Sequence, residues 1–347
     1  MNDTISYRLN VIRLLAAHMV LWGHAFAMFR LTIFQSNEHF ASLQRVGVVL
    51  LVFISGYLTM HSFVSKNMNF KQFAKNRFFR IYPSYIISLI FIFSVDRVWQ
   101  FLNSESYAYS TAFNLKHFIG NVFLIQDFPY LTEISSFGSG RPLWTLSVEW
   151  WTYFFAAFIF YRIIPKAIER NLKWSDIAIV TLLGIIPVHN LTYGRGRVVL
   201  AWIMGCLVYL LYNRCIFRVF NSRIKNTLYH LCLKSAAVLF LLVVLWKYKN
   251  AYHELTYLAI FVVGILYLNK DEKSKCFGGK KLNRLAAYTY PLYLCHYSIF
   301  TFVRAVFDYN DVTKFIVSIL LSNIVAIVIY YMVEWVRLVY KKKFISI

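Results

Sequence analysis

The chain has 347 residues, of which 59% are hydrophobic, 19% aromatic and only 15% charged, and its formal net charge is +22. Soluble domains average about 45–50% apolar and about 25% charged residues. This composition therefore excludes a disordered chain, a secreted disulfide scaffold and an ordinary cytosolic enzyme. Because the apolar runs are continuous rather than alternating, we predict an all-α, polytopic membrane bundle. We interpret the positive charge as a topology signal rather than as nucleic-acid binding.

Ten apolar segments approach the length of about 20 residues that a bilayer-crossing helix needs. They lie near 9–29, 46–63, 81–95, 143–161, 175–189, 197–213, 228–246, 252–268, 286–303 and 315–336. The first segment is long and contains Arg13 and His18, so we interpret it as a retained helix rather than a signal peptide. No repeat or soluble domain interrupts the pattern, and residues 1–347 are predicted to form one membrane domain.

Basic residues set the predicted orientation. One side holds 24 of the 37 Lys and Arg residues, from Arg8, the C-terminus and loops 64–80, 162–174, 214–227 and 269–285. Since basic loops stay in the cytoplasm, both termini are predicted to be cytoplasmic. On the other side, residues 96–141 form a long extracytoplasmic loop that contains Asp96, Glu105, Asp127 and Glu133. This loop is either a helical hairpin lying on the membrane or a wall that faces an acceptor.

Ionisable residues inside the first span need a partner or a function, because a charged group in a span costs about 2.5–3.5 kcal/mol on insertion scales. Arg13 and His24 are eleven positions apart, which places them within roughly 20° on one helix face and roughly 16 Å apart along the axis. We expect both to line one continuous polar tunnel. His18 points about 140° away from Arg13, and we interpret it as a helix-packing hydrogen bond.

The fourth span carries Glu149 a turn or two from its external end, together with Ser147 and Tyr153. A buried carboxylate there can orient an imidazole or can pair with a structural arginine such as Arg141. At the cytoplasmic side of the third span, Arg77 and Arg80 are either topology charges or, together with Arg13, a cluster that binds a polyanion.

Two further spans carry small or polar residues. In the second span, Ser55 and Gly56 indicate close helix packing, and the ninth span places Tyr293 and His296 on adjacent turns. The five cysteines form no CxxC pair and the histidines lack ligand spacing, so we predict neither a redox centre nor a metal site.

Five motifs in order across nearly the whole chain resemble those of the acyltransferase-3 family of bacterial membrane acyltransferases. They are IRLLAAHMVLWGH, VGVVLLVFISGYL, RFFRIYP, LWTLSVEWWTY and YPLYLCH. The family's residues correspond to Arg13 and His24, to Arg77 and Arg80 of its Arg-x-x-Arg motif, approximately to Trp144, Ser147 and Glu149, and to Tyr293 and His296. Asn10 stands where an Asp is common in the family, and Leu14 where a Gly is usual.

The resemblance implies an O-acyltransferase of the bacterial cytoplasmic (inner) membrane. It would move an acyl group, usually acetyl, from cytoplasmic acetyl-CoA or another acyl-CoA to a hydroxyl of a cell-surface glycan. O-antigen, capsule polysaccharide or a lipid-linked precursor would be the acceptor, and no metal would take part. Some relatives carry an esterase-like domain after the last span. This chain resembles the stand-alone type, which completes transfer itself or with a separate partner.

The implied mechanism assigns a role to each matched residue. Arg13, Arg77 and Arg80 would bind the phosphates of acyl-CoA. His24 would act as the general base, an effect typically worth 10²–10⁴ in rate. Glu149 would orient His24, while Ser147, Tyr293 or His296 would donate hydrogen bonds to the oxyanion.

The sequence leaves alternatives open for both the intermediate and the function. An acyl-histidine intermediate is an alternative to direct transfer. The rival function is a transporter or flippase for a polyanionic lipid or sugar, although the sequence lacks the internal repeats and broken half-helices expected of one. A scaffolding protein would leave the shared face of Arg13 and His24 unexplained.

Overall fold

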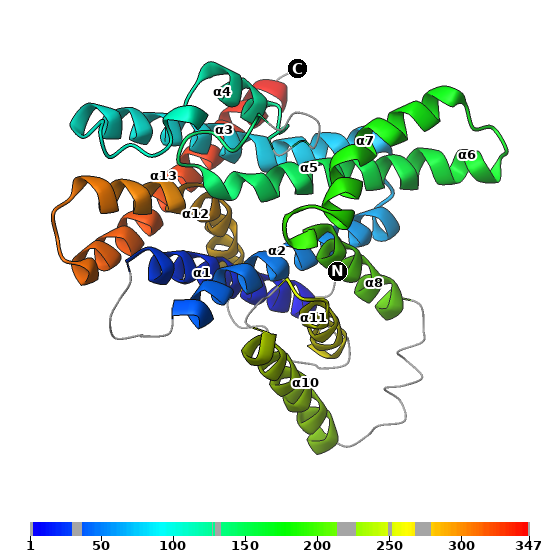
Figure 1. Cartoon of the computed structure of the whole chain (residues 1–347). Helices are drawn as coiled ribbons and strands as arrows, with labels where there is room; N and C mark the ends of the chain where they lie inside the picture. The colour runs from blue at the N-terminus through cyan, green and yellow to red at the C-terminus, as the bar shows by residue number, and fades with distance from the viewer. Residues whose placement is uncertain are drawn as a thin grey trace.

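The regular structure of this protein is helical. The computed structural model describes residues 3–29, 37–126, 128, 133–213, 227–248, 252–267 and 279–345, and no strand occurs in that part of the chain (Figure 1). The longer helices are α1 (Asp3–Phe29), α2 (Asn37–Ser65), α3 (Phe70–Leu102), α5 (Trp144–Phe158), α7 (Trp174–Thr192), α8 (Val198–Asn213), α10 (Thr227–Tyr248), α11 (Glu254–Tyr267), α12 (Gly279–Val306) and α13 (Asp311–Ile345). Each of the ten predicted apolar segments overlaps one of these helices.

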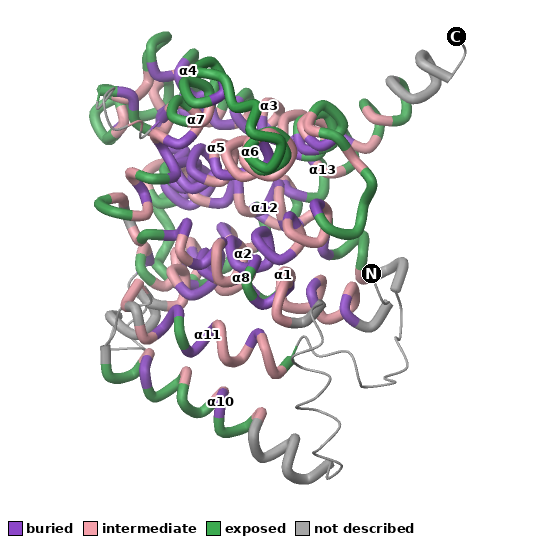
Figure 2. Tube along the Cα trace, turned by 90° about the vertical axis from the view of Figure 1, so that its right-hand side faces the viewer, coloured by how far each residue is buried: buried purple, intermediate pink, exposed green. Residues whose placement is uncertain are grey.

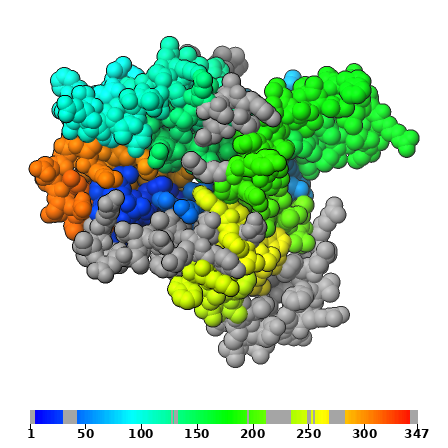
Figure 3. All heavy atoms as spheres, viewed as in Figure 1, coloured from blue at the N-terminus to red at the C-terminus, as the bar shows by residue number. Residues whose placement is uncertain are grey.

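Short elements connect several of the long ones. They are the 3-10 turns η1 (Ser110–Ala112), η2 (Arg141–Leu143) and η4 (Arg195–Arg197), the helices α4 (Leu115–Val122) and α6 (Ile164–Ile168), and the π-helix η3 (Ile159–Ile163). The α6 helix and the adjoining end of α7 project from the body of the bundle (Figures 1 and 3).

Five of the described helices are long and apolar enough to cross a membrane. They are Ile5–Phe29, Leu43–Ser65, Phe70–Leu102, Trp174–Thr192 and Asp311–Val339. Their outer faces stay apolar, as on α13, where Leu320 and Ile324 are 57% and 56% exposed. Soluble proteins rarely expose such contiguous faces, which suit contact with lipid. Ten crossings and two cytoplasmic termini stay predictions, and much of the predicted loops 214–227 and 269–285 lies outside the described residues.

The core lies where the long helices meet. Buried residues concentrate in the middle of the bundle, while α10 at its edge is largely exposed (Figure 2). The α1 helix packs against α2 and α12, and α12 also packs against α13 and α3. As a result, the polar residues of α1 and α12 share the centre of the bundle.

The α2 and α8 helices approach closely at two glycines. A Cβ on Gly56 would collide with the carbonyl oxygen of Trp202, and a Cβ on Gly205 would collide with that of Phe53. Only glycine permits this separation, because any side chain would occupy the space of the opposing backbone. The predicted packing role of Gly56 is confirmed.

The α3 helix continues beyond the predicted span end at residue 95. Asn69 and Gln72 cap its start, and Asp96 stays inside the helix because its carboxylate accepts hydrogen bonds from the Ser139 backbone N (2.8 Å) and Oγ (2.6 Å). Nearer the start of the helix, the Tyr85 hydroxyl donates to the Asn121 carbonyl oxygen at 2.7 Å. The described part of the predicted loop 96–141 is thus attached to the bundle.

Candidate functional site

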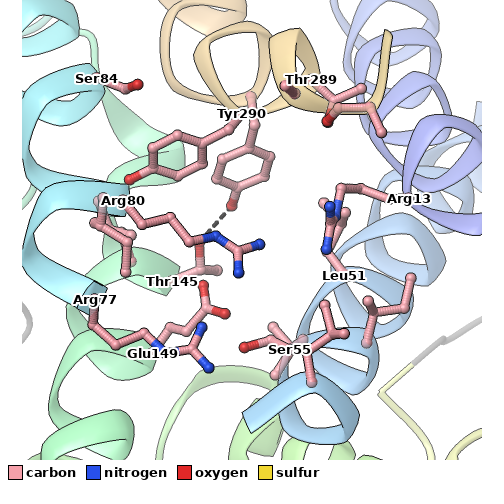
Figure 4. Close-up of a pocket in the computed structure, with 18 of the residues that line it drawn as sticks. Arg13, Leu51, Ser55, Arg77, Arg80, Ser84, Thr145, Glu149, Thr289 and Tyr290 are labelled. Carbon is pink, nitrogen blue, oxygen red and sulfur yellow. Dashed lines mark hydrogen bonds between the residues drawn. The ribbon is translucent and has the colours of Figure 1, made fainter. Parts of the chain in front are cut away.

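A cavity of about 260 Å³ lies among α1, α2, α3, α5, α12 and α13, and we call it the arginine cavity. The described arginines that line it are Arg13, Arg77, Arg80 and Arg337. Figure 4 shows Arg13 on α1 facing Arg77 and Arg80 across the space, with Glu149 between the two sides. The three arginines named from the sequence therefore meet at one site.

Arg77 and Arg80 occupy this cavity differently. Arg77 is buried, donates from Nη2 to Thr59 Oγ1 at 3.0 Å, and places its guanidinium carbon 4.4 Å from the Tyr153 ring centroid and 5.0 Å from that of Phe73. Aromatic faces stabilise a cation that has left water. Arg80 is exposed, so it can meet an incoming ligand while Arg77 supplies a fixed positive charge.

Arg13 is held by an amide where the family commonly has an acid. Its Nη1 donates to Asn10 Oδ1 at 3.4 Å, and Asn10 Nδ2 donates to Asn283 Oδ1 at 2.6 Å. Because an amide carries no charge, this pair links α1 to α12 without neutralising Arg13. The departure at Asn10 leaves the positive charge of the cavity intact.

Arg337 also lines the cavity, although the sequence indicates only that it is one of the basic residues at the C-terminus. Pro83 lacks the backbone N–H that would bond the Phe79 carbonyl in a regular helix. Arg337 Nη2 donates to that carbonyl oxygen at 3.3 Å, and its Nη1 donates to Glu334 Oε1 at 2.6 Å. Pro83 indicates from the sequence that one helical carbonyl lacks its N–H donor. Only the packing of α13 on α3 identifies Arg337 as the donor that replaces it.

Glu149 lies with the arginines and not beside His24. The Tyr153 hydroxyl donates to Glu149 Oε1 at 2.5 Å, so the Ser55 hydroxyl, also 2.5 Å from it, must be the donor to Tyr153. All three residues line the arginine cavity. The carboxylate therefore sits among cations, with its position set by α2 and α5.

A second cavity of about 620 Å³ contains His24, and we call it the histidine cavity. It shares Val48 and Tyr293 with the arginine cavity. Where one continuous tunnel was expected, the structure shows two cavities that share these two lining residues. The Tyr293 hydroxyl is held at the junction, 2.5 Å from Thr145 Oγ1 and 3.1 Å from the Pro142 carbonyl oxygen.

His24 faces a second imidazole. The ring centroids of His24 and His296 are 5.2 Å apart, and that of Tyr297 lies 5.1 Å from His24. His296 Nδ1 lies 2.9 Å and 3.1 Å from two carbonyl oxygens, which only accept, so Nδ1 carries the proton. The remaining nitrogen, Nε2, is buried without a hydrogen-bond partner among the described residues and is left as an acceptor.

Two other predicted residues lie apart from these cavities. Ser147 Oγ donates to the Leu124 carbonyl oxygen at 2.7 Å, which Trp151 Nε1 also contacts at 2.8 Å, so Ser147 supports the chain before α5. His18 Nδ1 bonds the Leu14 carbonyl oxygen, and its Nε2 lies 3.1 Å from the Tyr288 hydroxyl. The helix-packing interpretation of His18 is confirmed. In the described part of the chain, no cluster of His, Cys, Asp or Glu suits a metal ion.

The chain is similar to known proteins over most of its length. A family described as an acyltransferase domain, acyltransferase-3, matches residues 6–331. The O-acetyltransferase OatA of Staphylococcus aureus strains NCTC 8325 / PS 47, COL and MRSA252 is 21% identical over 338 residues, covering 89% of this chain and 55% of the relative. The chain spans about half the length of these curated relatives, and no solved structure matches it significantly. Since the match runs from α1 into α13 and covers nearly the whole chain, the chain belongs to the acyltransferase-3 family.

Proposed function

We propose that this protein is a membrane O-acetyltransferase of the bacterial inner membrane. It transfers an acetyl group from cytoplasmic acetyl-CoA to a hydroxyl of a cell-surface glycan or of its lipid-linked precursor. The observation that carries the proposal is the pair of cavities that share Val48 and Tyr293 as lining residues, one lined by arginines and the other by His24. The name of OatA and the family match support the same chemistry.

The arginine cavity suits the phosphate end of the donor. Guanidinium groups bind phosphates through paired hydrogen bonds, and several in one site repel one another unless an anion is present. Arg13, Arg77, Arg80 and Arg337 supply the charge, and Glu149 offsets part of it. The pantetheine arm would pass Val48 and Tyr293, so that the thioester reaches the histidine cavity while the phosphates stay behind.

The reaction then needs one base. His24 takes the proton of the acceptor hydroxyl, whose oxygen attacks the thioester carbonyl carbon. The C–O bond forms, the C–S bond breaks, and the protonated imidazole returns its proton to the CoA thiolate. The acetyl group thus crosses the membrane while CoA does not.

His296 is the positioning residue that best suits His24. Nε2 of His296 can only accept a hydrogen bond. If a ring N–H of His24 turns toward it and donates that bond, the other ring nitrogen of His24 carries no proton and acts as the base. We assign Glu149 a role other than orienting His24. By accepting the hydrogen bond of the Tyr153 hydroxyl, it fixes the aromatic ring that the Arg77 guanidinium contacts. In this proposal the Tyr293 hydroxyl contacts the thioester oxygen.

The test is release of CoA and acetylation of a glycan by purified protein in liposomes. His24→Ala should lower transfer by about 10²–10⁴ and leave CoA affinity unchanged. His18→Asn on the same helix should keep transfer, because His18 contacts Tyr288 away from both cavities. Near-normal transfer by His24→Ala would refute the assigned base. If no form of the protein releases CoA with any acceptor, the proposed function is refuted.

A further inference from the structure

The histidine cavity is itself strongly cationic. Arg45 of α2, Arg141 of η2 and Arg304 of α12 line it, and none of its described lining residues is Asp or Glu. These arginines come from three distant parts of the chain and converge only in the fold. The cavity that holds the catalytic imidazole therefore gathers three positive charges.

Arginines are unexpected at this end of the bundle. Of the 37 basic residues, only 11 fall on the predicted extracytoplasmic side, where membrane proteins keep few. Three of those 11 line this one cavity. Topology explains the basic residues of the opposite side, but it does not explain this convergence.

The chemistry of the cavity indicates what would occupy it. Arg141 and Arg304 are exposed, and the Arg45 guanidinium carbon lies 5.9 Å from the Tyr252 ring centroid. Guanidinium forks match carboxylate and phosphate oxygens. Trp144 and Tyr297 add aromatic surfaces that combine apolar faces with polar edges. This combination suits a sugar that carries an anionic group better than a neutral sugar.

We infer that the acceptor is an anionic glycan, with a carboxylate or phosphate held by Arg141 and Arg304 near the hydroxyl that meets His24. This inference rests on the proposed function for its direction of transfer, but the charge preference is a property of binding alone. The donor phosphates occupy the other cavity, so the two anions meet different arginines.

The experiment measures binding and transfer separately with matched oligosaccharides. Three probes share one backbone: a uronic-acid oligosaccharide, its carboxyl-reduced form, and a form with a phosphodiester in place of the carboxylate. Affinity is measured by calorimetry, and transfer is followed by CoA release. Arg141→Gln and Arg304→Gln are compared with Arg97→Gln, an exposed arginine of the same predicted side that does not line the cavity.

We expect an anionic probe to bind at least about tenfold more tightly than the reduced form. Arg141→Gln and Arg304→Gln should each lose most of that preference and keep the KM for acetyl-CoA, while Arg97→Gln should keep both. Preference for the uronic acid or for the phosphodiester identifies the source of the charge.

Equal affinity for charged and reduced probes would overturn the inference. A requirement for anionic lipid in the vesicle, with no preference among the probes, would also overturn it, because the arginines would then bind lipid headgroups. A charge preference in binding without CoA release from any probe would refute the proposed transfer while supporting the anionic ligand. The two failures are thus distinguishable.

Discussion

Replacing Arg80 by Gln removes one positive charge from the arginine cavity without opening a hole in the core. Arg80 is exposed, whereas Arg77 is buried and bonded to Thr59. The Arg80 backbone carbonyl lies 3.4 Å from Arg337 Nη2, and the substitution preserves this contact. The variant should therefore fold normally and report on ligand binding alone.

The size of the effect follows from the charge lost. A hydrogen bond to a charged group contributes about 1.5–3 kcal/mol, which corresponds to roughly 10- to 150-fold in Kd. Removing Arg80 also relieves its repulsion with the other arginines of the empty cavity. We therefore expect the lower end of this range, about a tenfold weaker affinity for CoA.

The measurement is titration calorimetry of purified protein with CoA and with 3′-dephospho-CoA. Lys75→Gln is the matched control, because Lys75 is an exposed cation on the same helix that does not line the cavity. A loss that disappears with 3′-dephospho-CoA would assign Arg80 to the 3′-phosphate, and a loss that persists would assign it to the diphosphate. If Arg80→Gln binds CoA as the wild type does, or if Lys75→Gln weakens binding equally, the phosphate assignment is wrong.

Three further changes test the junction, the second imidazole and the packing. Val48→Trp should fill the junction and stop transfer while CoA still binds, whereas Val48→Ala should transfer acetyl normally. CoA release by Val48→Trp at the wild-type rate would rule out passage of the pantetheine arm past Val48. His296→Gln, whose amide oxygen can replace Nε2 as acceptor, should keep more kcat than His296→Leu at unchanged KM for acetyl-CoA, and equal kcat values would argue against positioning. Gly205→Val should lower the free energy of unfolding by ~1–3 kcal/mol or more, and with it the unfolding temperature, because the side chain collides across the α2–α8 contact. Leu207→Val on the exposed face of α8 should leave the unfolding temperature nearly unchanged. An unchanged unfolding temperature for Gly205→Val would contradict the contact.

Local periodicity in the sequence was enough to predict where the helices lie and which side chains share a helix face. Apolar runs give helices because each run satisfies its own backbone hydrogen bonds, and all ten predicted segments overlap helices. The angle between side chains on one helix is equally local. It separated His18, which contacts Tyr288, from Arg13 and His24, which line cavities.

Pairings between helices were not accessible in this way. Spacing along α5 does not say which neighbour Glu149 meets, and the structure places it with the arginines while His24 meets His296. Ser147 was predicted as a site residue because, with Trp144 and Glu149, it approximately matches a motif of the family. Its hydroxyl turns to the Leu124 carbonyl, a contact set by the path of the preceding segment.

The sequence by itself determined the helical class of this protein, the family resemblance and the residues able to carry charge inside a bundle. These follow from composition, period and motif, each of which acts over a few residues. Only the tertiary structure decided that Arg337 joins the arginine cavity, that Tyr293 and Val48 line both cavities, and that Arg45, Arg141 and Arg304 line the cavity that contains His24. Contacts between residues a hundred or more positions apart depend on how whole helices pack, and no local pattern encodes that arrangement.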